Sequence, residues 1–415
     1  MKYLILALLL ASGSVQADAR QVDDYQWEGV SRVVAIGDLH GDYENYLAAL
    51  QAAGVADRKG KWSGGDAHLV QTGDIPDRGP DTLKIFEHLD KLARQAERKG
   101  GRVHSLIGNH EAMNVYGDLR YVSKGEYEAF VSRNSETLRD RYFELYLQAL
   151  ERQDPETFAN LPENFRETWN VEHPLGWVEH RQAWDPAWNP EAELARRVLD
   201  SKVAVRINDT LFVHGGISGF YCRNSLASLT EGVRSGLVNF DPQTPGIVED
   251  EFGPLWYRGL SGVAPEAPPE TVDAILAHHG VKRIAVGHTP TSGVIWPQYG
   301  GKVVMIDTGI SDAYGGHLGW LELTPEGVYA GYPGGRLPLP TGEQSRVEYL
   351  ENVIALVPGN PYLERRLAQL KQPQEPAVAE AESGDSGQEA GEDAPGTQEA
   401  PQQAPVEIPI CGISQ

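Results

Sequence analysis

The strongest constraint on this sequence is a series of short apolar runs, each followed at once by residues that can bind a metal ion. The run Val33–Ile36 leads through a glycine to Asp38 and His40, two side chains that are costly to bury without partners. The same arrangement recurs along the chain and delivers these further candidates: Asp74, Asn109 with His110, His214 and His288. Because sites in open α/β sheets gather at the carboxyl ends of strands, we predict that these residues meet in one polar site.

The donor atoms of these candidates are nitrogen and oxygen, and no thiolate is among them. Such a set suits manganese, iron, zinc or cobalt better than copper or an iron–sulfur cluster. A shared carboxylate could hold two cations about 3.5–4 Å apart, an arrangement that clamps a phosphate group and supplies a nucleophile at neutral pH. We therefore expect two divalent metal ions, with manganese as the first choice and iron, zinc or cobalt as alternatives.

Five motifs in fixed order give the chain a family resemblance, and they read GDLHGD, GDIPDRG, GNHE, VHGG and GHT. This series resembles the calcineurin-like metallophosphoesterases, and DRG with GNHE resembles their phosphoprotein phosphatase branch. Three further stretches resemble the Shewanella-like protein phosphatase subfamily: MNVYGDLRYV, HPLGWVEHRQAW and LWYRGL. The resemblance implies an α/β fold in which two packed β-sheets are flanked by helices, a four-layer sandwich, with a helical cap insertion.

The resemblance also implies a distribution of the metal ligands. Asp38 and His40 would bind the first ion, Asp74 would bridge both ions, and Asn109, His214 and His288 would bind the second. Many superfamily members carry a further histidine two residues after the position of His288, where this chain has Pro290. The first ion would therefore have fewer protein ligands. Asp307 and Asp312 follow another apolar run, and we interpret them as a strand-end turn rather than as partners of a metal-binding histidine.

The resemblance further assigns the catalytic and substrate-binding roles. His110 would be the general acid that protonates the leaving oxygen, oriented by Asp77, and a metal-bridging hydroxide would hydrolyse the phosphoester directly. Arg78 and Arg258 would hold the phosphate oxygens, since guanidinium groups match a tetrahedral dianion. The alternatives are a surface ion pair for Arg78 and, for Arg258, a partly buried side chain stacked on a neighbouring aromatic ring.

These features predict a binuclear-metal phosphomonoesterase, most consistent with a protein phosphatase acting on a phosphoprotein or a small phosphoester. One alternative is a nucleotide or dinucleoside polyphosphate hydrolase, a class that typically carries aspartate where Glu111 stands. A second alternative is a non-catalytic phosphopeptide-binding protein, which the intact His110 and Asp77 oppose. The formal charge of -23 argues against nucleic acid as a partner. The oligomeric state stays open.

The two ends of the chain differ in composition from its middle. Residues 1–17 read as a secretory signal peptide, because Lys2 precedes an apolar stretch and small residues precede Asp18. A membrane anchor is the alternative, but the stretch is short, so we expect no stable membrane insertion after cleavage and a periplasmic or secreted protein. The folded domain is predicted over 25–370. Residues 372–405 are predicted to be a disordered acidic tail rich in proline, glutamate and alanine, followed by a short apolar segment, 406–415.

Inside the domain, residues 112–207 are predicted to form an insert. Its spacing of apolar residues predicts a helix over Tyr127–Gln153, in addition to helices over Tyr43–Ala53 and Thr82–Lys99. Four tryptophans fall in the insert, and an ordinary hydrophobic core is the simpler interpretation, with a substrate-selecting cap as the alternative.

The chain has two cysteines, Cys222 and Cys411, and neither lies in a metal-binding pair. In an oxidising compartment they could form a disulfide bond with each other. Free thiols or a bond between two chains are the alternatives.

Overall fold

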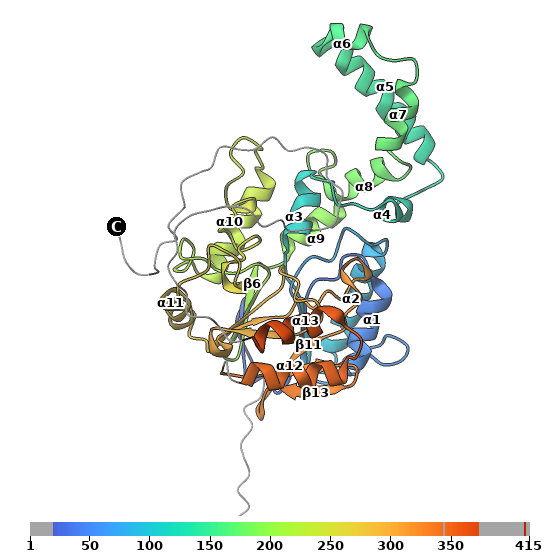
Figure 1. Cartoon of the computed structure of the whole chain (residues 1–415). Coiled ribbons are helices and arrows are strands. Elements are labelled where there is room, and N and C mark those ends of the chain that lie inside the picture. The colour runs from blue at the N-terminus through green and yellow to red at the C-terminus, as the bar shows by residue number, and fades with distance from the viewer. Residues whose placement is uncertain (1–19, 343–344, 373–410, 412–415) are drawn as a thin grey trace, which may run out of the picture.

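The structure is a computed structural model, which describes residues 20–342, 345–372 and 411. At its centre lie two mixed β-sheets, flanked by helices (Figure 1). The first sheet has the strand order β1-β2-β6-β7-β8-β10-β9 and the second has the order β13-β12-β11-β3-β4-β5. The predicted α/β architecture is therefore confirmed.

The strands are short, and their bounds are β1 Arg20–Asp23, β2 Gln26–Glu28, β3 Val33–Ile36, β4 His68–Gln71, β5 Arg102–Ser105, β6 Ala204–Ile207, β7 Thr210–Val213, β8 Arg283–Val286, β9 Trp296–Gln298, β10 Val303–Met305, β11 Trp320–Thr324, β12 Gly327–Tyr332 and β13 Gly335–Pro338. The α-helices are α1 Tyr43–Ala52, α2 Thr82–Glu97, α3 Asn109–Tyr116, α4 Lys124–Ala129, α5 Ser135–Gln153, α6 Pro155–Ala159, α7 Phe165–Glu172, α8 Trp177–Trp184, α9 Glu193–Asp200, α10 Leu226–Val238, α11 Pro269–His279, α12 Ser345–Leu356 and α13 Pro361–Leu370. The described residues also include the 3₁₀ turns η1 Gly246–Val248, η2 Gly259–Ser261, η3 Tyr299–Gly301 and η4 Asp312–Tyr314.

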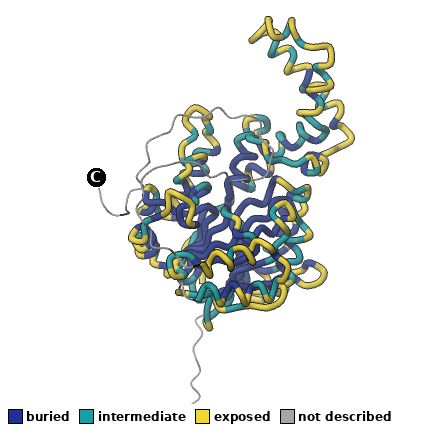
Figure 2. The backbone as a smooth tube through the Cα atoms, in the orientation of Figure 1, coloured by how far each residue is buried: buried dark blue, intermediate teal, exposed yellow. Residues whose placement is uncertain are grey.

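Each sheet contains a parallel core of three strands. β3, β4 and β5 run parallel in one sheet, and β7, β8 and β10 run parallel in the other. All residues of β3, β4 and β7 are buried, as expected for strands covered on both faces. The carboxyl ends of these strands deliver the polar motifs (Figure 2 shows the buried centre in dark blue).

The loops that leave these strand ends pack closely. A Cβ atom added to Gly37 would lie 2.6 Å from the Cα atom of Asp307, which belongs to the segment after β10. A Cβ atom on Gly73 would lie 2.5 Å from the backbone nitrogen of Gly108. Only glycine permits such approaches, so these residues let the motifs after β3, β4, β5 and β10 meet.

The insert contains α4 to α9, and its outer part is a helical arm, here defined as residues 135–172 and consisting of α5, α6 and α7. The arm points away from the sheets and is mostly exposed (Figures 1 and 2). The predicted helix over Tyr127–Gln153 is wrong in its first part, because the chain forms α4, a turn and then α5. In that turn the hydroxyl of Ser135 accepts the N–H of Ser132, and the hydroxyl of Ser132 accepts the N–H of Asn134, which ends the helical ladder.

The other predicted boundaries fall close to the observed ones. Helices α1 and α2 end one and two residues before the predicted ends, and α13 ends at Leu370. Strand β1 begins at Arg20, five residues before the predicted domain start. The predicted signal peptide, tail and apolar end segment lie outside the described residues, apart from Gln372 and Cys411. Among the described helices, none combines the length and the apolar character needed to cross a membrane.

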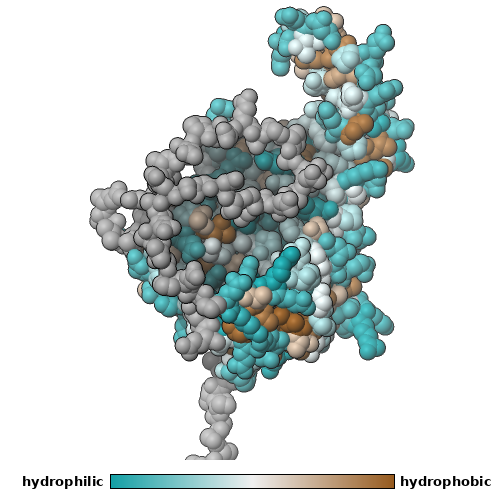
Figure 3. Space-filling view, viewed as in Figure 1, coloured by the Kyte–Doolittle hydropathy of each residue, from teal (hydrophilic) through white to brown (hydrophobic). Residues whose placement is uncertain are grey.

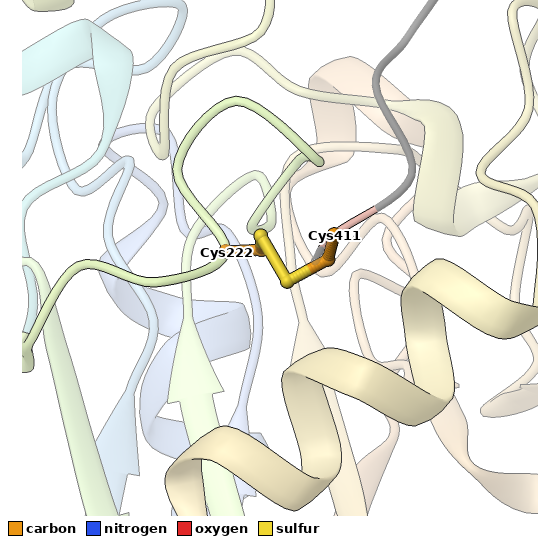
Figure 4. Close-up of a disulfide and its surroundings, with 2 residues drawn as sticks. All are labelled: Cys222 and Cys411. Atoms are coloured by element: carbon orange, nitrogen blue, oxygen red, sulfur yellow. A yellow bond between two sulfur atoms is a disulfide. The ribbon is translucent and has the colours of Figure 1, made fainter. Parts of the chain in front are cut away.

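The structure joins Cys222 to Cys411 in a disulfide bond, which confirms the predicted pairing (Figure 4). Cys222 is buried in the loop that follows β7, and Cys411 packs against the hydrophobic core. The bond closes a loop over a sequence separation of 189 residues. It therefore ties the C-terminal end of the chain to the loop that begins at the predicted ligand His214.

Candidate active site

Asp74, which follows β4, lies at the centre of the predicted site. Its Oδ2 atom is 3.3 Å from Nε2 of His214 and 3.9 Å from Nε2 of His40. Two groups of possible metal ligands share this carboxylate, one with His40 and His110 and the other with His214 and His288, and in each group the ligand atoms lie within 4.8 Å of one another. One acidic side chain between two histidine pairs is the geometry expected of a bridging ligand.

The hydrogen bonds around His214 direct one of its ring nitrogens into the site. Its Nδ1 atom is 3.0 Å from the carbonyl oxygen of Thr72, which can only accept, so Nδ1 donates to that oxygen and Nε2 points into the site. That Nε2 atom lies 2.9 Å from Oδ1 of Asn109, besides its contact with Asp74. One ring nitrogen and two side-chain oxygens thus converge, and a cation bound between them could contact all three atoms.

Two further histidines are held in the same manner. His40 Nδ1 donates to the carbonyl of Pro76 at 3.2 Å, and His288 Nε2 donates to the carbonyl of Trp256 at 3.1 Å. Burial lowers the pKa of His40 to about 3 and lowers the pKa of His288 well below its usual value, so both rings are neutral. Neutral imidazole is the form that binds metal. Both carboxylate oxygens of Asp38 accept the backbone N–H of His288 at 3.1 Å, which places this predicted ligand against the second histidine pair.

The site concentrates negative charge away from water. Five carboxyl groups that the structure describes are almost fully buried in it: Asp38, Asp74, Asp77, Glu111 and Asp307. Burial, followed by the charges of its neighbours Asp307 and Asp74, raises the pKa of Asp38 well above its usual value. Burial also raises the pKa values of Asp307 and Glu111 to about 6. Among the described residues, no lysine or arginine forms an ion pair with these carboxyl groups, so the residues present fit divalent cations.

Glu111 supports the site through the backbone. Its carboxylate accepts N–H groups from Asp74 at 2.9 Å, from Ile75 at 2.7 Å and from Gly108 at 2.8 Å. These bonds tie the loop after β4 to the loop after β5. Glu111 therefore fixes the left-handed backbone of Asp74, whose φ is 59°.

The predicted acid pair is formed. His110 Nδ1 lies 2.5 Å from Oδ2 of Asp77, and Asn114 Nδ2 donates to the other oxygen of Asp77 at 3.0 Å. Burial lowers the pKa of His110, but the negative charges of Asp74 and Asp77 outweigh that effect and raise it. With Nδ1 bound to Asp77, Nε2 of His110 faces Asp74 at 3.9 Å. His110 thus stands both among the possible ligands and in the position of a proton donor.

The two predicted phosphate-binding arginines lie at different depths. Arg78 is exposed, and its guanidinium carbon is 4.2 Å from the ring centre of Tyr121 and 5.9 Å from that of Tyr314. Arg258 is half-buried and donates to the carbonyl oxygen of His288 at 2.7 Å. Arg258 therefore supports the loop that carries a ligand, whereas Arg78 is free to contact a bound molecule.

Sequence reasoning missed the two tyrosines. The ring of Tyr314 lies 5.0 Å from that of His40, and the ring of Tyr121 lies 5.1 Å from that of His110. Tyr121 belongs to the stretch DLRYV, which carried part of the subfamily resemblance, so a signal was present there. Tyr314 ends a 3₁₀ turn after β10 and had no signal in the sequence beyond the end of an apolar run.

The turn predicted at Asp307 and Asp312 is present, but its role was underestimated. Asp307 accepts the N–H of Gly309 at 3.0 Å, and Asp312 accepts the side-chain amide of Asn45 at 2.8 Å. Asp307 is also buried beside Asp38 and contributes to the raised pKa of that residue. It is therefore part of the negative charge of the site as well as of the turn.

Residues 31–292 match the calcineurin-like phosphoesterase family. Shewanella-like protein phosphatase 2 of Arabidopsis thaliana is 33% identical over 69% of this chain and 73% of its own length. Shewanella-like protein phosphatase 1 of Plasmodium berghei is 26% identical over 70% of this chain and 69% of its own length. The cold-active protein-tyrosine phosphatase of a psychrophilic Shewanella species, a solved structure, superposes with a TM-score of 0.57 at 27% identity, over 77% of this chain and 83% of that chain. The chain belongs to the calcineurin-like phosphoesterase family and is a metal-dependent phosphoester hydrolase homologous to the Shewanella-like protein phosphatases.

Proposed function

We propose that this protein is a binuclear-metal phosphomonoesterase whose substrates are phosphorylated proteins. The observation that carries the proposal is the position of Asp74 between two histidine pairs, directly beside the hydrogen-bonded pair of His110 and Asp77. Manganese is the first choice of metal, and the nitrogen and oxygen donors also accept iron, zinc or cobalt.

In this mechanism the metal ions would supply positive charge for the phosphate and lower the pKa of water to near neutrality. Arg78 would bind phosphate oxygens from the rim, and Arg258 would do so from the inner side if its bond to the His288 loop is shared with substrate. Asp77 holds Nδ1 of His110, so that Nε2 can give a proton to the leaving oxygen. The raised pKa of His110 favours its protonated form, which is the form that a general acid requires.

Two observations favour phosphotyrosine among the phosphorylated residues. The rings of Tyr121 and Tyr314 stand next to Arg78, His110 and His40, so an aryl leaving group would enter between aromatic surfaces. A structural relative is also named a protein-tyrosine phosphatase. An aromatic ring in this position would stack, whereas the side chain of phosphoserine would not.

We also propose that the protein is exported to a periplasmic or extracellular compartment. The disulfide between Cys222 and Cys411 supports this location, since such bonds persist where conditions are oxidising. Fractionation of cells that express the full chain, followed by N-terminal sequencing, tests export. Recovery of a cytosolic protein that keeps residues 1–17 would contradict it.

The decisive experiment is a substrate panel measured after reconstitution with each candidate metal. Phosphotyrosine, phosphoserine and phosphothreonine peptides are compared with nucleotides and dinucleoside polyphosphates. We expect the highest kcat/KM on a phosphotyrosine peptide. A clear preference for dinucleoside polyphosphates would overturn the protein phosphatase assignment, and absence of turnover with every metal would overturn the hydrolase mechanism.

A further inference from the structure

The segment that carries Asp77 and Arg78 has an unfavourable backbone conformation. Both residues are left-handed, with φ of 72° and 67°, although neither is glycine. A residue other than glycine is strained in this conformation, which persists only where the surroundings hold it. This turn presents Asp77 to the candidate acid His110 and places Arg78 at the rim.

Contacts from the beginning of the insert hold this turn in place. The carboxyl of Glu126 accepts the backbone N–H of Asp77 at 3.0 Å, and the carbonyl of Tyr121 accepts that of Arg78 at 3.0 Å. The hydroxyl of Ser123 donates to the carbonyl of Gly79 at 3.1 Å. Three consecutive residues of the turn are thus bound by one short segment that precedes the helical arm.

Glu126 is the unusual member of this set, because its side chain is fully buried in α4. On its other side, Oε1 of Glu126 faces Nε2 of His180 in α8 at 4.0 Å, and the His180 side chain is also fully buried. Nε2 of His180 has no hydrogen-bond partner among the described residues, and the side chain of Thr82 also lies against the Glu126 carboxyl. Because this carboxyl is buried, it does not contribute to the solubility of the surface. Its bond to the backbone of Asp77 indicates a structural role at the acid pair instead.

We infer that Glu126 is a positioning residue for the Asp77–His110 pair, acting as the hydrogen-bond acceptor that fixes the left-handed turn. This inference rests on the proposed function, since it concerns the same acid. Without the acceptor, the N–H of Asp77 would be buried and unpaired, and the turn could relax away from His110. The insert therefore contributes to proton transfer through its first helix.

The protonation state of Glu126 makes the inference specific. Burial, followed by the negative charge of Asp77, raises the pKa of Glu126 to about 8. A neutral acid at pH 7 has nearly the shape of glutamine, which also offers an oxygen to the N–H of Asp77. Glu126→Gln should therefore rescue what Glu126→Leu loses.

The test uses the full chain and two substrates, an aryl phosphate with a good leaving group and a phosphoserine peptide with a poor one. Glu126→Leu should lower kcat on the phosphoserine peptide about tenfold and leave kcat on the aryl phosphate nearly unchanged. The tenfold loss is a part of the ~10²–10⁴-fold rate increase that general acids contribute. Glu126→Gln should restore most of that loss. In a His110→Asn background the effect of Glu126→Leu should vanish, because the group it positions is gone.

A matched control is Asp185→Leu, which removes another buried carboxylate of the insert that bonds to Arg181 and to the N–H of Ala187. We expect it to affect both substrates equally. Equal losses on both substrates for Glu126→Leu, or the same loss with and without His110, would overturn the inference.

A spectroscopic measurement keeps the inference testable independently of turnover and of the leucine variant. The proton on Nδ1 of His110 should give a far-downfield NMR signal, identified by its absence in His110→Asn. Glu126→Asp shortens the side chain that carries the acceptor oxygen and should shift that signal. Glu126→Gln should leave the signal in place. If the wild-type protein is inactive but its His110 signal shifts in Glu126→Asp and not in Glu126→Gln, the proposed function is refuted and the positioning role is retained. If the signal does not move in Glu126→Asp, the positioning role is refuted.

Discussion

The metal centre and the insert both bury histidines, but they do so in opposite ways. His214 has the carbonyl oxygen of Thr72 at one ring nitrogen and the side-chain oxygens of Asn109 and Asp74 at the other. His180 is equally buried, yet neither of its nitrogens has a hydrogen-bond partner among the described residues, and the rings of Tyr127 and Phe130 pack around it. Burial alone therefore does not mark a functional histidine; convergence of donors from separate strands does.

The aromatic residues of the insert follow the same rule. Trp169 stacks on His173 with ring centres 4.1 Å apart, and Tyr142 lies 5.1 Å from Trp177 and 4.9 Å from Trp188. These contacts join residues within the insert and stabilise the helical arm. The arm projects from the body, and hydrophobic residues are scattered among hydrophilic ones on its surface (Figure 3). The insert's link to chemistry is instead its first segment, which holds the turn at Asp77.

The largest expected effect comes from the centre of the site. Asp74→Asn should remove most activity and lower the metal content, because one bridging carboxylate neutralises two cations. Metal analysis of the purified variant, together with turnover of an aryl phosphate, checks this. Two ions per chain with near-normal turnover would show that Asp74 does not bridge two metal ions. The contrast between the histidines of the metal site and the buried His180 of the insert would then lose its basis.

His110→Asn separates the acid from the ligands. We expect both metal ions to remain and kcat on an alkyl phosphoester to fall ~10²–10⁴-fold, since proton donation typically contributes that much. The loss should shrink on an aryl phosphate, whose leaving group needs less protonation. Because His110 also stands among the possible ligands, a parallel loss of metal would assign it to coordination instead.

Much of this site could be predicted from the sequence because each strand end has a local signature. An apolar run, a glycine and a polar residue are adjacent in the chain, and parallel strands bring such ends to one edge. Asp307 shares that signature only in part, and Tyr314 and Glu126 have none, because their positions depend on how η4 and α4 fold back onto the body. The break between α4 and α5 was missed because Phe130 continued the apolar spacing although Ser132 and Ser135 form a hydroxyl-capped turn.

A substitution in the insert tests the other side of the comparison. Trp169 is almost fully buried in the arm, so Trp169→Ala should destabilise the arm by about 3–5 kcal/mol, the usual cost of such a truncation. Turnover of a small aryl phosphate should stay within about twofold of wild type, well under one kcal/mol. Hydrogen exchange of α7 and steady-state kinetics measure the two effects. A large loss on the small substrate would show that the arm, and not only the segment near Glu126, supports the chemistry.

The buried His180 predicts a pH dependence of stability. Burial, followed by the charge of Arg181, lowers the pKa of His180 to about 3, so the unfolded chain binds a proton there below about pH 6.5 while the folded chain does not. Stability of the insert should therefore fall as the pH drops from 6.5 towards 3, by at most about 1.4 kcal/mol per pH unit. Hydrogen exchange of α8 at several pH values, with His180→Phe as comparison and His278→Phe as an exposed control, checks the slope. An unchanged slope in His180→Phe would assign the dependence to other groups.

The smallest effect is expected from the disulfide between Cys222 and Cys411, which lies outside the insert and is linked to the metal site only through the loop that begins at His214. Loop entropy for so long a closed loop would suggest about 5 kcal/mol. The sequence predicts a disordered tail over 372–405, and if folding leaves that tail unordered, the stabilisation should be smaller. Cys222→Ser should therefore lower the free energy of unfolding by less than that figure and leave aryl phosphate turnover unchanged.

Because the bond ties Cys411 to the loop that begins at His214, release of the tether should raise kcat/KM on a large phosphoprotein if the end segment restricts access. Non-reducing peptide mapping of the exported protein establishes the bond, and Cys411→Ser serves as the matched variant. Two free thiols in that map would remove the tether altogether, whereas an intact bond with identical phosphoprotein kinetics in both variants would leave it a structural link only.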